Sequence, residues 1–355
     1  MNNVIVDSST IDLLSPTNIK NNVLPYYDLS FDSKIYQVKF KDTDKQRAVY
    51  KIYSNGNEYC LKKIYYEVDE LLFIYSALEW LYRNNINVPR ILSTKTHGRY
   101  VNYHGMLFIL TDWLKGAKCD FDNIEDVNLA SRNLGKLHSI SLGFEPILGS
   151  KHKCGFNNLA QSLTKHTLQL INNEKHTKNY NDYFSKIYML SFTDSMTLAT
   201  LACNIANTID ISNLSKSICH NDYVSKNLIV NDGEIFVIDF DKCKDDYCAL
   251  DISYCLRRLL RRENTWWNCD LAINFLQQYE LNHTLTIDDY KYILAYLTFP
   301  QKYWKLSRDY YSNISKCNKQ AFVNLLNKCV CHNDIHIDFS YKLLKYIEGK
   351  FDILI

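Results

Sequence analysis

The stretch from residue 218 to 251 constrains the fold of this 355-residue chain more than any other part of it. It contains the pattern His-x-Asp-x-x-x-x-Asn, which is filled by His220, Asp222 and Asn227. A short apolar run, Leu228–Val230, follows at once and has the composition of a buried strand. The pattern therefore predicts a loop that carries polar side chains into the start of a β-strand.

A tight β-hairpin is predicted directly after this loop. Asp232-Gly233 is a preferred two-residue hairpin turn, and a second apolar run, Ile235–Ile238, leads into Asp239. In such a hairpin Asn227 lies opposite residue 238 or residue 239, depending on the type of loop. Only the second register places Asn227 and Asp239 on the same face, and we favour that register.

The polar residues at this end of the hairpin suit phosphoryl transfer. Mg²⁺ prefers oxygen ligands and keeps most of its waters, so the Asp239 carboxylate and the Asn227 amide oxygen can suffice as its protein ligands. Asp241 is a further candidate, for a second metal ion or a phosphate-bound water. We expect Asp222 to accept the proton of an acceptor hydroxyl and His220 to brace the loop through hydrogen bonds.

Asp251 is expected to support the same loop. It lies just inside the next predicted helix, where its carboxylate can accept backbone N–H groups. The alternative is that these aspartates are ordinary acids at strand ends. The conjunction of the spaced pattern, the two apolar strands and the Asp-Gly turn argues against that alternative.

Composition narrows the remaining possibilities. Hydrophobic residues make up 46% and charged residues 23% of the chain, which suits a folded core, and the net charge of +2 gives no basis for binding nucleic acid or a membrane surface. The N-terminus has no basic or apolar run, and no stretch approaches ~18 apolar residues, so we expect neither a secretion signal nor a membrane span. The 12 cysteines form no even framework and are expected to be reduced thiols in a cytoplasmic protein.

The residue patterns divide the chain into a sheet-rich part and a helical part. Asn55-Gly56 predicts a hairpin turn, and residues 71–82 have the apolar spacing of one main helix. Alternating apolar and polar residues predict the strands of a small antiparallel sheet: Ile35–Phe40, Ala48–Tyr53, Glu58–Ile64, Ile91–Ser93 and Met106–Asp112.

From residue 116 onward the pattern is mostly helical. An apolar stripe recurs at helical spacing between Val127 and Leu137, and Thr286 with Asp289 resembles a capping box. We therefore predict an α+β protein with a smaller lobe at residues 20–115, a hinge near 111–116 and a larger helical lobe at 116–355.

The segment HNDYVSKN…VIDFD resembles the catalytic and metal-binding motifs of the aminoglycoside phosphotransferase and choline kinase branch of protein-kinase-like enzymes. More narrowly, residues 237–262 and the segment FPQKYWKLSRDYYSN (299–313) are similar to CotS-type spore coat proteins of endospore-forming bacteria. The resemblance runs from about residue 20 to 345. It implies a two-lobed kinase-like fold, in which 20–115 is the nucleotide-binding lobe and 116–355 the catalytic and substrate lobe that carries the hairpin.

The resemblance also implies a lysine that binds the ATP phosphates. In the strand sequence Glu-Tyr-Cys-Leu-Lys-Lys, Lys62 is similar to that lysine, and Lys63 alternates to the other face of the sheet. Its partner glutamate is expected on the following helix, where Glu70 is our choice and Glu67 the alternative.

The adenine contacts are implied in the same way. Thr111 is expected to guard the adenine pocket, while the Asp112 carbonyl and the Leu114 amide bind the base. The turn that would cover the phosphates, residues 41–47, contains no glycine. Protein kinases need glycine there, and the aminoglycoside kinase branch often lacks it, so this turn favours relatives that act on small molecules.

We therefore predict an ATP- and Mg²⁺-dependent kinase that acts on a hydroxyl of a small-molecule acceptor and is associated with the spore coat. The alternative is a weak or inactive kinase-like structural protein of the coat. The resemblance places the protein in the mother-cell cytoplasm with deposition on the coat, where other coat proteins are candidate partners. No nucleic acid or membrane partner is expected.

Three further features have an ordinary and a functional interpretation. The arginines at 257, 258, 261 and 262 form a basic stripe, which we interpret as a solvated face paired with nearby acids rather than a site for an anionic substrate. The Cys/His-rich segment 329–336 is expected to scatter along a helix rather than bind metal. The aromatic pairs at 266–267 and 303–304 are expected in the core rather than stacked on a substrate.

Overall fold

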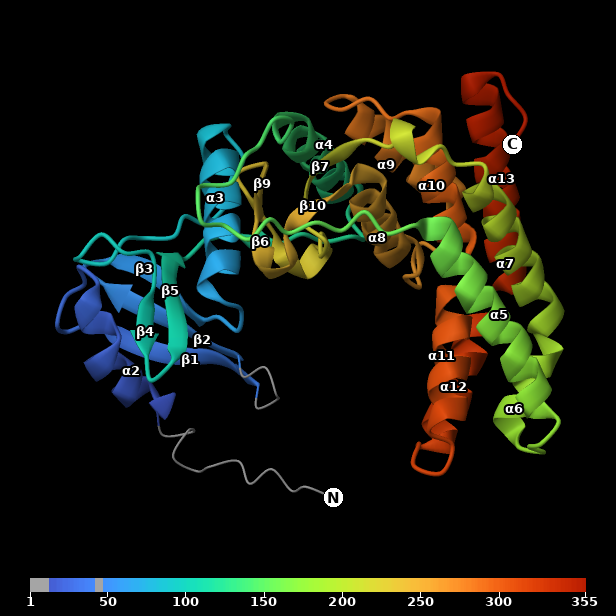
Figure 1. The fold of residues 1–355 in the computed structure, drawn as a ribbon, viewed down its shortest axis with the longest axis horizontal. Helices are drawn as coiled ribbons and strands as arrows, with labels where there is room; N and C mark the ends of the chain where they lie inside the picture. The colour runs from blue at the N-terminus through green and yellow to red at the C-terminus, as the bar shows by residue number, and fades with distance from the viewer. Residues whose placement is uncertain (1–12, 42–46) are drawn as a thin grey trace. The chain divides into compact units, whose positions relative to one another are not determined.

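The computed structural model describes residues 13–41 and 47–355, and the chain divides into two compact units (Figure 1). Unit 1 comprises Met1–Ala117, Gly143–Lys153 and Ile229–Asp241. Unit 2 comprises Lys118–Leu142, Cys154–Leu228 and Lys242–Ile355. The first division lies close to the predicted one at residue 116, but two later segments group with unit 1 instead of the helical unit.

Unit 1 is built on a five-stranded antiparallel sheet with strand order β1-β2-β3-β5-β4. Asn55 and Gly56 have φ angles of 51° and 78°, as the predicted hairpin turn requires. The strands are β1 (Lys34–Lys41), β2 (Arg47–Ser54), β3 (Asn57–Lys63), β4 (Val101–Tyr103) and β5 (Met106–Asp112).

The strand predicted at 91–93 is wrong. Ile91 makes an isolated bridge to Thr111, and the Leu92 N–H bonds to Leu110, but the chain then turns where the Thr94 N–H bonds to Gly98. The fifth strand is β4, which a turn at His104-Gly105 joins to β5. The sequence alternation was therefore too short to distinguish one bridge from a strand.

One face of the sheet packs on the N-terminal helix. Helix α2 (Pro16–Asn22) begins at Ser15, whose hydroxyl accepts the Asn18 N–H, and the 3₁₀ turn η1 (Leu24–Tyr26) follows it. Apolar side chains from both and from four strands share one buried cluster: Ile19, Val23, Leu24, Ile52, Leu61, Val101, Phe108 and Leu110. Burial of this cluster holds one face of the sheet against α2.

Segment 143–153 belongs to unit 1 because it packs on α3 (Val68–Arg83). The Phe144 ring lies 5.7 Å from Phe73 and 5.9 Å from Trp80, both in edge-to-face arrangements. The Ile147 N–H also donates to the Ser76 hydroxyl at 3.1 Å. These contacts join residues about seventy positions apart, so a contiguous division of the sequence could not include them.

The predicted hairpin is present as β8 (Leu228–Asn231) and β9 (Glu234–Val237), with Asp232 and Gly233 at φ 51° and 77°. It belongs mostly to unit 1, since the Val237 N–H donates to the Asn87 carbonyl at 2.9 Å and Phe236 bridges Asn87. A short strand, β6 (Ala117–Lys118), completes the order β6-β8-β9. Asn227 lies just before β8 and Asp239 just beyond β9, so both flank the paired residues.

Unit 2 is mostly helical, as predicted. Thr286 forms the predicted capping box with Asp289 at the start of α10. No helix in the described part of the chain is long and apolar enough to cross a membrane. The helices are α4 (Ile124–Ile140), α5 (Leu159–Thr177), α6 (Tyr183–Leu190), α7 (Phe192–Asn207), α8 (Cys248–Leu260), α9 (Cys269–Glu280), α10 (Ile287–Thr298), α11 (Gln301–Ser312), α12 (Lys319–Val330) and α13 (Asn333–Phe351).

Helices α4 and α9 pack unusually closely. A Cβ at Gly135 would lie 2.4 Å from the Tyr279 carbonyl oxygen, so only glycine permits this approach. The contact matters for the site because His138, one turn after Gly135, forms a hydrogen bond with the Tyr279 hydroxyl. The close packing of α4 on α9 thereby fixes the position of His138.

Candidate functional site

A two-stranded sheet in unit 2 positions the predicted catalytic loop. Strand β7 (Lys216–Cys219) pairs antiparallel with β10 (Lys244–Tyr247), and Cys219 lies opposite Lys244. Strand β7 runs directly into His220, and β10 runs directly into α8. The pairing therefore brings the first turn of α8, which contains Asp251, beside the loop.

Asp251 holds the backbone of this loop. Its two carboxylate oxygens accept the N–H groups of His220 at 2.6 Å and of Asn221 at 2.7 Å. Asn221 has φ 58°, a left-handed conformation that asparagine tolerates and that aims both N–H groups at one carboxylate. The hydrogen bonds expected of Asp251 are confirmed, while its support of catalysis stays a prediction.

His220 and Asn227 fix the backbone of Asp222. The Asp222 N–H donates to His220 Nδ1 at 3.2 Å, and Asn227 Nδ2 donates to the Asp222 carbonyl at 2.9 Å. Asn227 ends the 3₁₀ turn η3 (Ser225–Asn227), and all three side chains are buried. The residues of the spaced pattern therefore hold the loop in shape through hydrogen bonds to one another.

The Asp222 carboxylate lies among groups that stabilise its charge. Lys226 and Lys242 place their ammonium groups 3.3 and 3.5 Å from Oδ2, and the Tyr254 hydroxyl donates to Oδ1 at 3.3 Å. Burial works against ionisation, but Lys242 and Lys226 outweigh it and lower the pKa of Asp222 from its ordinary value. Asp222 is therefore a carboxylate at neutral pH, as a general base must be.

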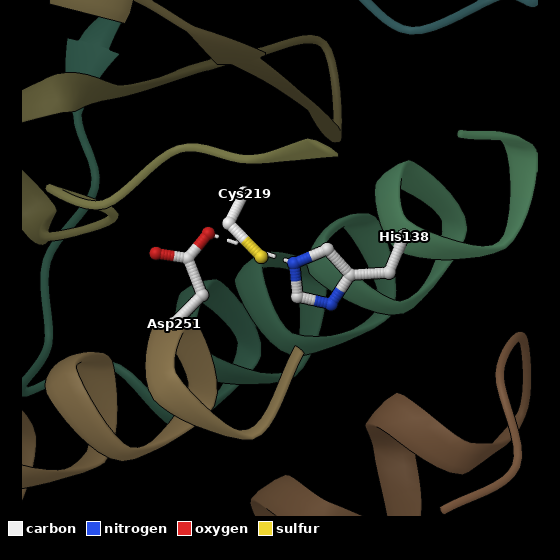
Figure 2. A group of neighbouring side chains, drawn as sticks. All are labelled: His138, Cys219 and Asp251. Carbon is white, nitrogen blue, oxygen red and sulfur yellow. Dashed lines mark ion pairs between the residues drawn. The ribbon is translucent and has the colours of Figure 1, made fainter. Parts of the chain in front are cut away.

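A buried cluster behind the loop supports Asp251 (Figure 2). His138 Nε2 lies 3.5 Å from Asp251 Oδ2, and the ligand atoms of His138, Cys219 and Asp251 all lie within 4.8 Å of one another. Burial opposes the charge of His138, but Cys248 and Asp251 outweigh it and raise its pKa. An imidazolium at this position balances the Asp251 carboxylate.

A second charged cluster forms in unit 1 around Lys62 on β3. Its ammonium group lies 2.7 Å from Asp239 Oδ1 and 2.6 Å from Asp241 Oδ1. Burial disfavours the charge of Lys62, but Asp241 and Asp239 outweigh it and raise the pKa above the usual range. Asp239 has φ 68°, a left-handed turn after β9 that is uncommon for a residue with a side chain.

The predicted pairing of Lys62 with Glu70 is wrong. Glu70 lies in the first turn of α3, and its carboxylate contacts Lys151 at 3.2 Å and Lys153 at 3.5 Å. Segment 143–153 packs on α3 and supplies both of these lysines, while Lys62 takes its partners from the residues after β9. Glu67, the alternative, precedes α3 as its N-cap residue.

The acids of the Lys62 cluster fit a hard cation. Asp239 and Asp241 supply carboxylate oxygens of the kind that Mg²⁺ binds, and Asp241 Oδ2 is buried without a hydrogen-bond partner. The Lys153 ammonium donates to the Asp241 carbonyl at 3.1 Å, and the Tyr66 hydroxyl lies 3.5 Å from Asp241 Oδ1. A carboxylate oxygen without a partner in a buried position suits metal coordination.

The residues expected to contact adenine lie at the end of β5 and in the loop after it. Thr111 pairs with Cys60 on β3, and its hydroxyl donates to the Asp112 carbonyl at 3.3 Å. Leu114 is half-buried in the loop that follows. The turn expected to cover the phosphates falls mainly on residues 42–46, which lie outside the described residues.

Several charged or hydrogen-bonding neighbours were missed by the sequence analysis. Lys226 lies four residues after Asp222, so its proximity was readable from the spaced pattern itself. Lys242, Tyr254 and Lys153 reach the site from more distant segments, and no local pattern marks them.

Residues 37–291, which make up most of the chain, match the model of the phosphotransferase enzyme family, APH. The chain therefore belongs to this family, and the family resemblance inferred from its catalytic segment is confirmed.

Individual relatives agree with this assignment. Spore coat protein S of Bacillus subtilis (strain 168) is 19% identical over 300 residues, which are 82% of this chain and 84% of the relative. The fold is that of an aminoglycoside phosphotransferase from Alicyclobacillus acidocaldarius, with TM-score 0.78, 17% identity and coverage of 93% and 96% of the two chains. An amicoumacin kinase in complex with AMP-PNP, Ca²⁺ and Ami matches with TM-score 0.58, 14% identity and coverage of 94% and 96%.

Proposed function

We propose that this phosphotransferase uses ATP and Mg²⁺ to phosphorylate a hydroxyl of a small molecule. Membership of the family supports phosphoryl transfer, and the amicoumacin kinase with its ATP analogue and divalent cation supports the nature of the cofactors. The single observation that carries the proposal is the position of Asp222, a buried carboxylate that lysines hold in its charged form.

Each unit has its own role in this reaction. In unit 2, Asp222 accepts the hydroxyl proton, while His220, Asn227 and Asp251 keep its backbone in place. In unit 1, Lys62 binds ATP phosphate oxygens, and Asp239 and Asp241 are the acids available to a metal ion. Asn227 is proposed as a further oxygen ligand, since its amide nitrogen is already bonded to the Asp222 carbonyl.

The metal ion, when bound, would neutralise the charge that develops on the phosphate oxygens. Lys62 pairs with both Asp239 and Asp241, so its ammonium group holds these two carboxylates close together. Transfer of the Lys62 ammonium from the acids to phosphate would expose both carboxylates for coordination. Thr111, Asp112 and Leu114 are proposed to hold adenine at the end of β5.

A screen of alcohols with radiolabelled ATP tests the proposal. Asp222→Asn keeps the shape of the side chain but removes the base, and a base of this kind contributes about 10²–10⁴ in rate. We expect a loss of that size relative to wild type, while Asp338→Asn, an exposed acid in unit 2, leaves the rate unchanged. Equal turnover by wild type and Asp222→Asn would refute the assignment.

Association with the spore coat is a second proposal, which rests on the likeness to spore coat protein S. A structural protein of the coat would require the fold but not the chemistry. Immunodetection in purified coat fractions tests the location, and a spore that carries Asp222→Asn tests the alternative. Normal coat assembly with this variant would favour a scaffold, whereas defective assembly with normal protein levels would favour the enzyme.

A further inference from the structure

A small cavity in unit 2 is lined by cations. Its volume is about 70 Å³, several times the ~10–15 Å³ that one water molecule needs in such a cavity, so it has room for one small oxyanion. Among its lining residues, all of which the structure describes, none is Asp or Glu. Four of them are Lys or Arg: Arg257, Arg261, Lys302 and Lys328.

Three of these cations have no acidic partner. Arg257, Arg261 and Lys302 form no salt bridge within residues 13–41 and 47–355, whereas Lys328 pairs with Glu263 outside the cavity. Burial lowers the pKa of Arg257, of Arg261 and of Lys302. Arg257 and Lys302 are half-buried, whereas Arg261 is exposed. A half-buried cation without a counter-charge is costly, and a bound anion would offset that cost.

This finding corrects the sequence-based interpretation of the arginine stripe. Arg262 does pair with an acid, Asp122, as expected of a solvated face. Arg257 and Arg261 instead line the cavity, and the Arg257 guanidinium also lies 4.3 Å from the Tyr296 ring. The stripe is therefore divided: Arg262 pairs with an acid, exposed Arg258 donates to the Tyr254 hydroxyl, and the other two arginines have no acidic partner.

Two helix N-termini add donors to the same wall. Helix α11 begins after Pro300 and α13 begins after His332, and neither N-cap residue supplies a side-chain hydrogen bond. Both of these N-cap residues line the cavity. Uncapped N–H groups and the positive end of the helix dipole favour an anion there.

A buried amide group is an independent indication of a missing ligand. Asn333, the first residue of α13, lines the cavity, and its Nδ2 is buried without a hydrogen-bond partner. Such a group is rare because it forfeits its hydrogen bond with water. A bound oxyanion would supply the acceptor that this donor lacks.

Two strained tryptophans complete the wall. Trp266 and Trp267 have φ angles of 29° and 54°, conformations that bulky residues seldom adopt. Their rings lie 3.8 Å from those of His332 and His336, respectively. They are half-buried at this cavity rather than in the core as predicted, whereas Tyr303 and Trp304 are core residues. Strain of this kind concentrates where a binding site requires it.

We propose that this cavity binds the phosphate group of the acceptor, which is therefore a phosphorylated alcohol. Helix α8 links the cavity to the loop, since Tyr254 contacts Asp222 and Arg257 follows it by three residues, or about 4.5 Å along the axis. The assignment of the ligand as an acceptor rests on the proposed kinase function. The presence of an oxyanion site in the cavity does not depend on that function.

Calorimetry without nucleotide tests the site directly. The probes are inorganic phosphate, glycerol 3-phosphate and glucose 6-phosphate, with glycerol as the uncharged control. We expect the three anions to bind and glycerol not to bind. The double variant Arg257→Gln/Lys302→Gln removes two charge-assisted hydrogen bonds and is expected to weaken binding at least about tenfold.

Matched variants separate this site from other effects. Arg308→Gln removes an arginine of α11 that already pairs with Asp309, so it should leave anion binding unchanged. Lys302→Gln alone, together with the circular dichroism of every variant, guards against a loss of fold. Equal anion affinity in wild type and in the double variant would overturn the proposal, as would the absence of any binding at millimolar concentrations.

Kinetics then distinguish the failure of this proposal from the failure of the kinase function. Asp222→Asn should abolish turnover yet bind the anions as wild type does. Under the proposal, wild type phosphorylates the phosphate esters, inorganic phosphate competes with them, and the double variant raises KM far more than it lowers kcat. Turnover of neutral alcohols only, unaffected by the double variant, would leave the kinase function intact and overturn the acceptor assignment.

Discussion

The loop around Asp222 and the cluster around Lys62 hold their charges by different means. In the loop, fully buried Asp251 binds backbone N–H groups and Asn227 fixes the Asp222 backbone, while Lys226 and Lys242 pair with the Asp222 carboxylate. In the cluster, Lys62 and Asp239 meet side chain to side chain and keep 20% and 32% of their side-chain surface exposed. The loop is fixed by the fold, whereas the cluster is fixed by charges that a ligand can replace.

The difference separates structural acids from functional ones. A buried carboxylate bonded to the backbone is costly to remove, because donors remain buried without partners. Partly exposed ion pairs contribute little to stability and are free to exchange partners. We therefore expect mutations in the loop support to affect folding and mutations in the Lys62 cluster to affect nucleotide binding.

The largest expected effect on stability belongs to Asp251→Ala. It leaves the His220 and Asn221 N–H groups unpaired and removes the counter-charge of His138, so we expect a loss of about 3–5 kcal/mol in the free energy of unfolding. Urea denaturation measures it. Asp338→Ala, an exposed acid that pairs with Lys342, serves as the control and should change stability by less than about 0.5 kcal/mol. A loss below about 1 kcal/mol for Asp251→Ala would erase the distinction between the two regions.

Gly135→Ala tests the packing behind the loop. The new Cβ would meet the Tyr279 carbonyl oxygen at 2.4 Å and push α4 from α9, so we expect a loss of about 1–3 kcal/mol, measured as a change in Tm. Gly349→Ala is the control, since nothing lies within 4 Å of a Cβ at that helical position. The control should be neutral or slightly stabilising. Equal behaviour of the two variants would show that close approach of α4 does not support the loop.

Lys62→Met is expected to affect nucleotide binding much more than stability. It costs about 1–3 kcal/mol of stability, because the pair with Asp239 is partly exposed but the buried Asp241 carboxylate loses its counter-charge. Nucleotide binding should nevertheless be lost, which equilibrium dialysis with ATP would detect. A variant that binds ATP as wild type does would remove Lys62 from the proposed site.

The smallest expected effect is on pH dependence. The folded pKa of Asp222 lies below its unfolded value of about 3.9, so its contribution to stability is present above that pH and is lost as the pH falls through the folded pKa. Between about pH 5 and 8 the base stays ionised, and kcat should show no acid limb from Asp222. The double variant Lys226→Ala/Lys242→Ala raises the pKa of Asp222 and should shift the acid limb upward. An unchanged pH–rate profile would show that these lysines do not control the base.

Local patterns in the sequence predicted much of the fold. The Asn55-Gly56 and Asp232-Gly233 turns, the capping box at Thr286 and the sheet-then-helix order all depend on neighbouring residues, and the structure confirms them. The strand at 91–93 failed because a three-residue alternation cannot distinguish a single bridge from a strand. The sequence analysis placed segments 143–153 and 229–241 in the helical part, although both belong to unit 1. Their contacts to α3 and Asn87 are long-range, so no local pattern reveals them.

The candidate site was predictable to a similar degree. The spaced pattern of His220, Asp222 and Asn227 identified the loop, because those residues bond to one another within eight positions. The partner of Lys62 was not predictable, since Asp239 and Asp241 are almost 180 residues away. The unpaired arginines of the cavity were also misread, because the sequence shows their spacing but not which acids reach them.

The most direct test of the central claim is thermal denaturation with ATP, with and without Mg²⁺, in wild type and in Asp239→Ala. A ligand at about 100 times its Kd adds about 2.7 kcal/mol to the free energy of unfolding. The account predicts a Mg²⁺-dependent rise in the Tm of wild type that Asp239→Ala loses. No change in Tm with millimolar nucleotide and Mg²⁺ would contradict it and favour a coat scaffold with a kinase-like fold.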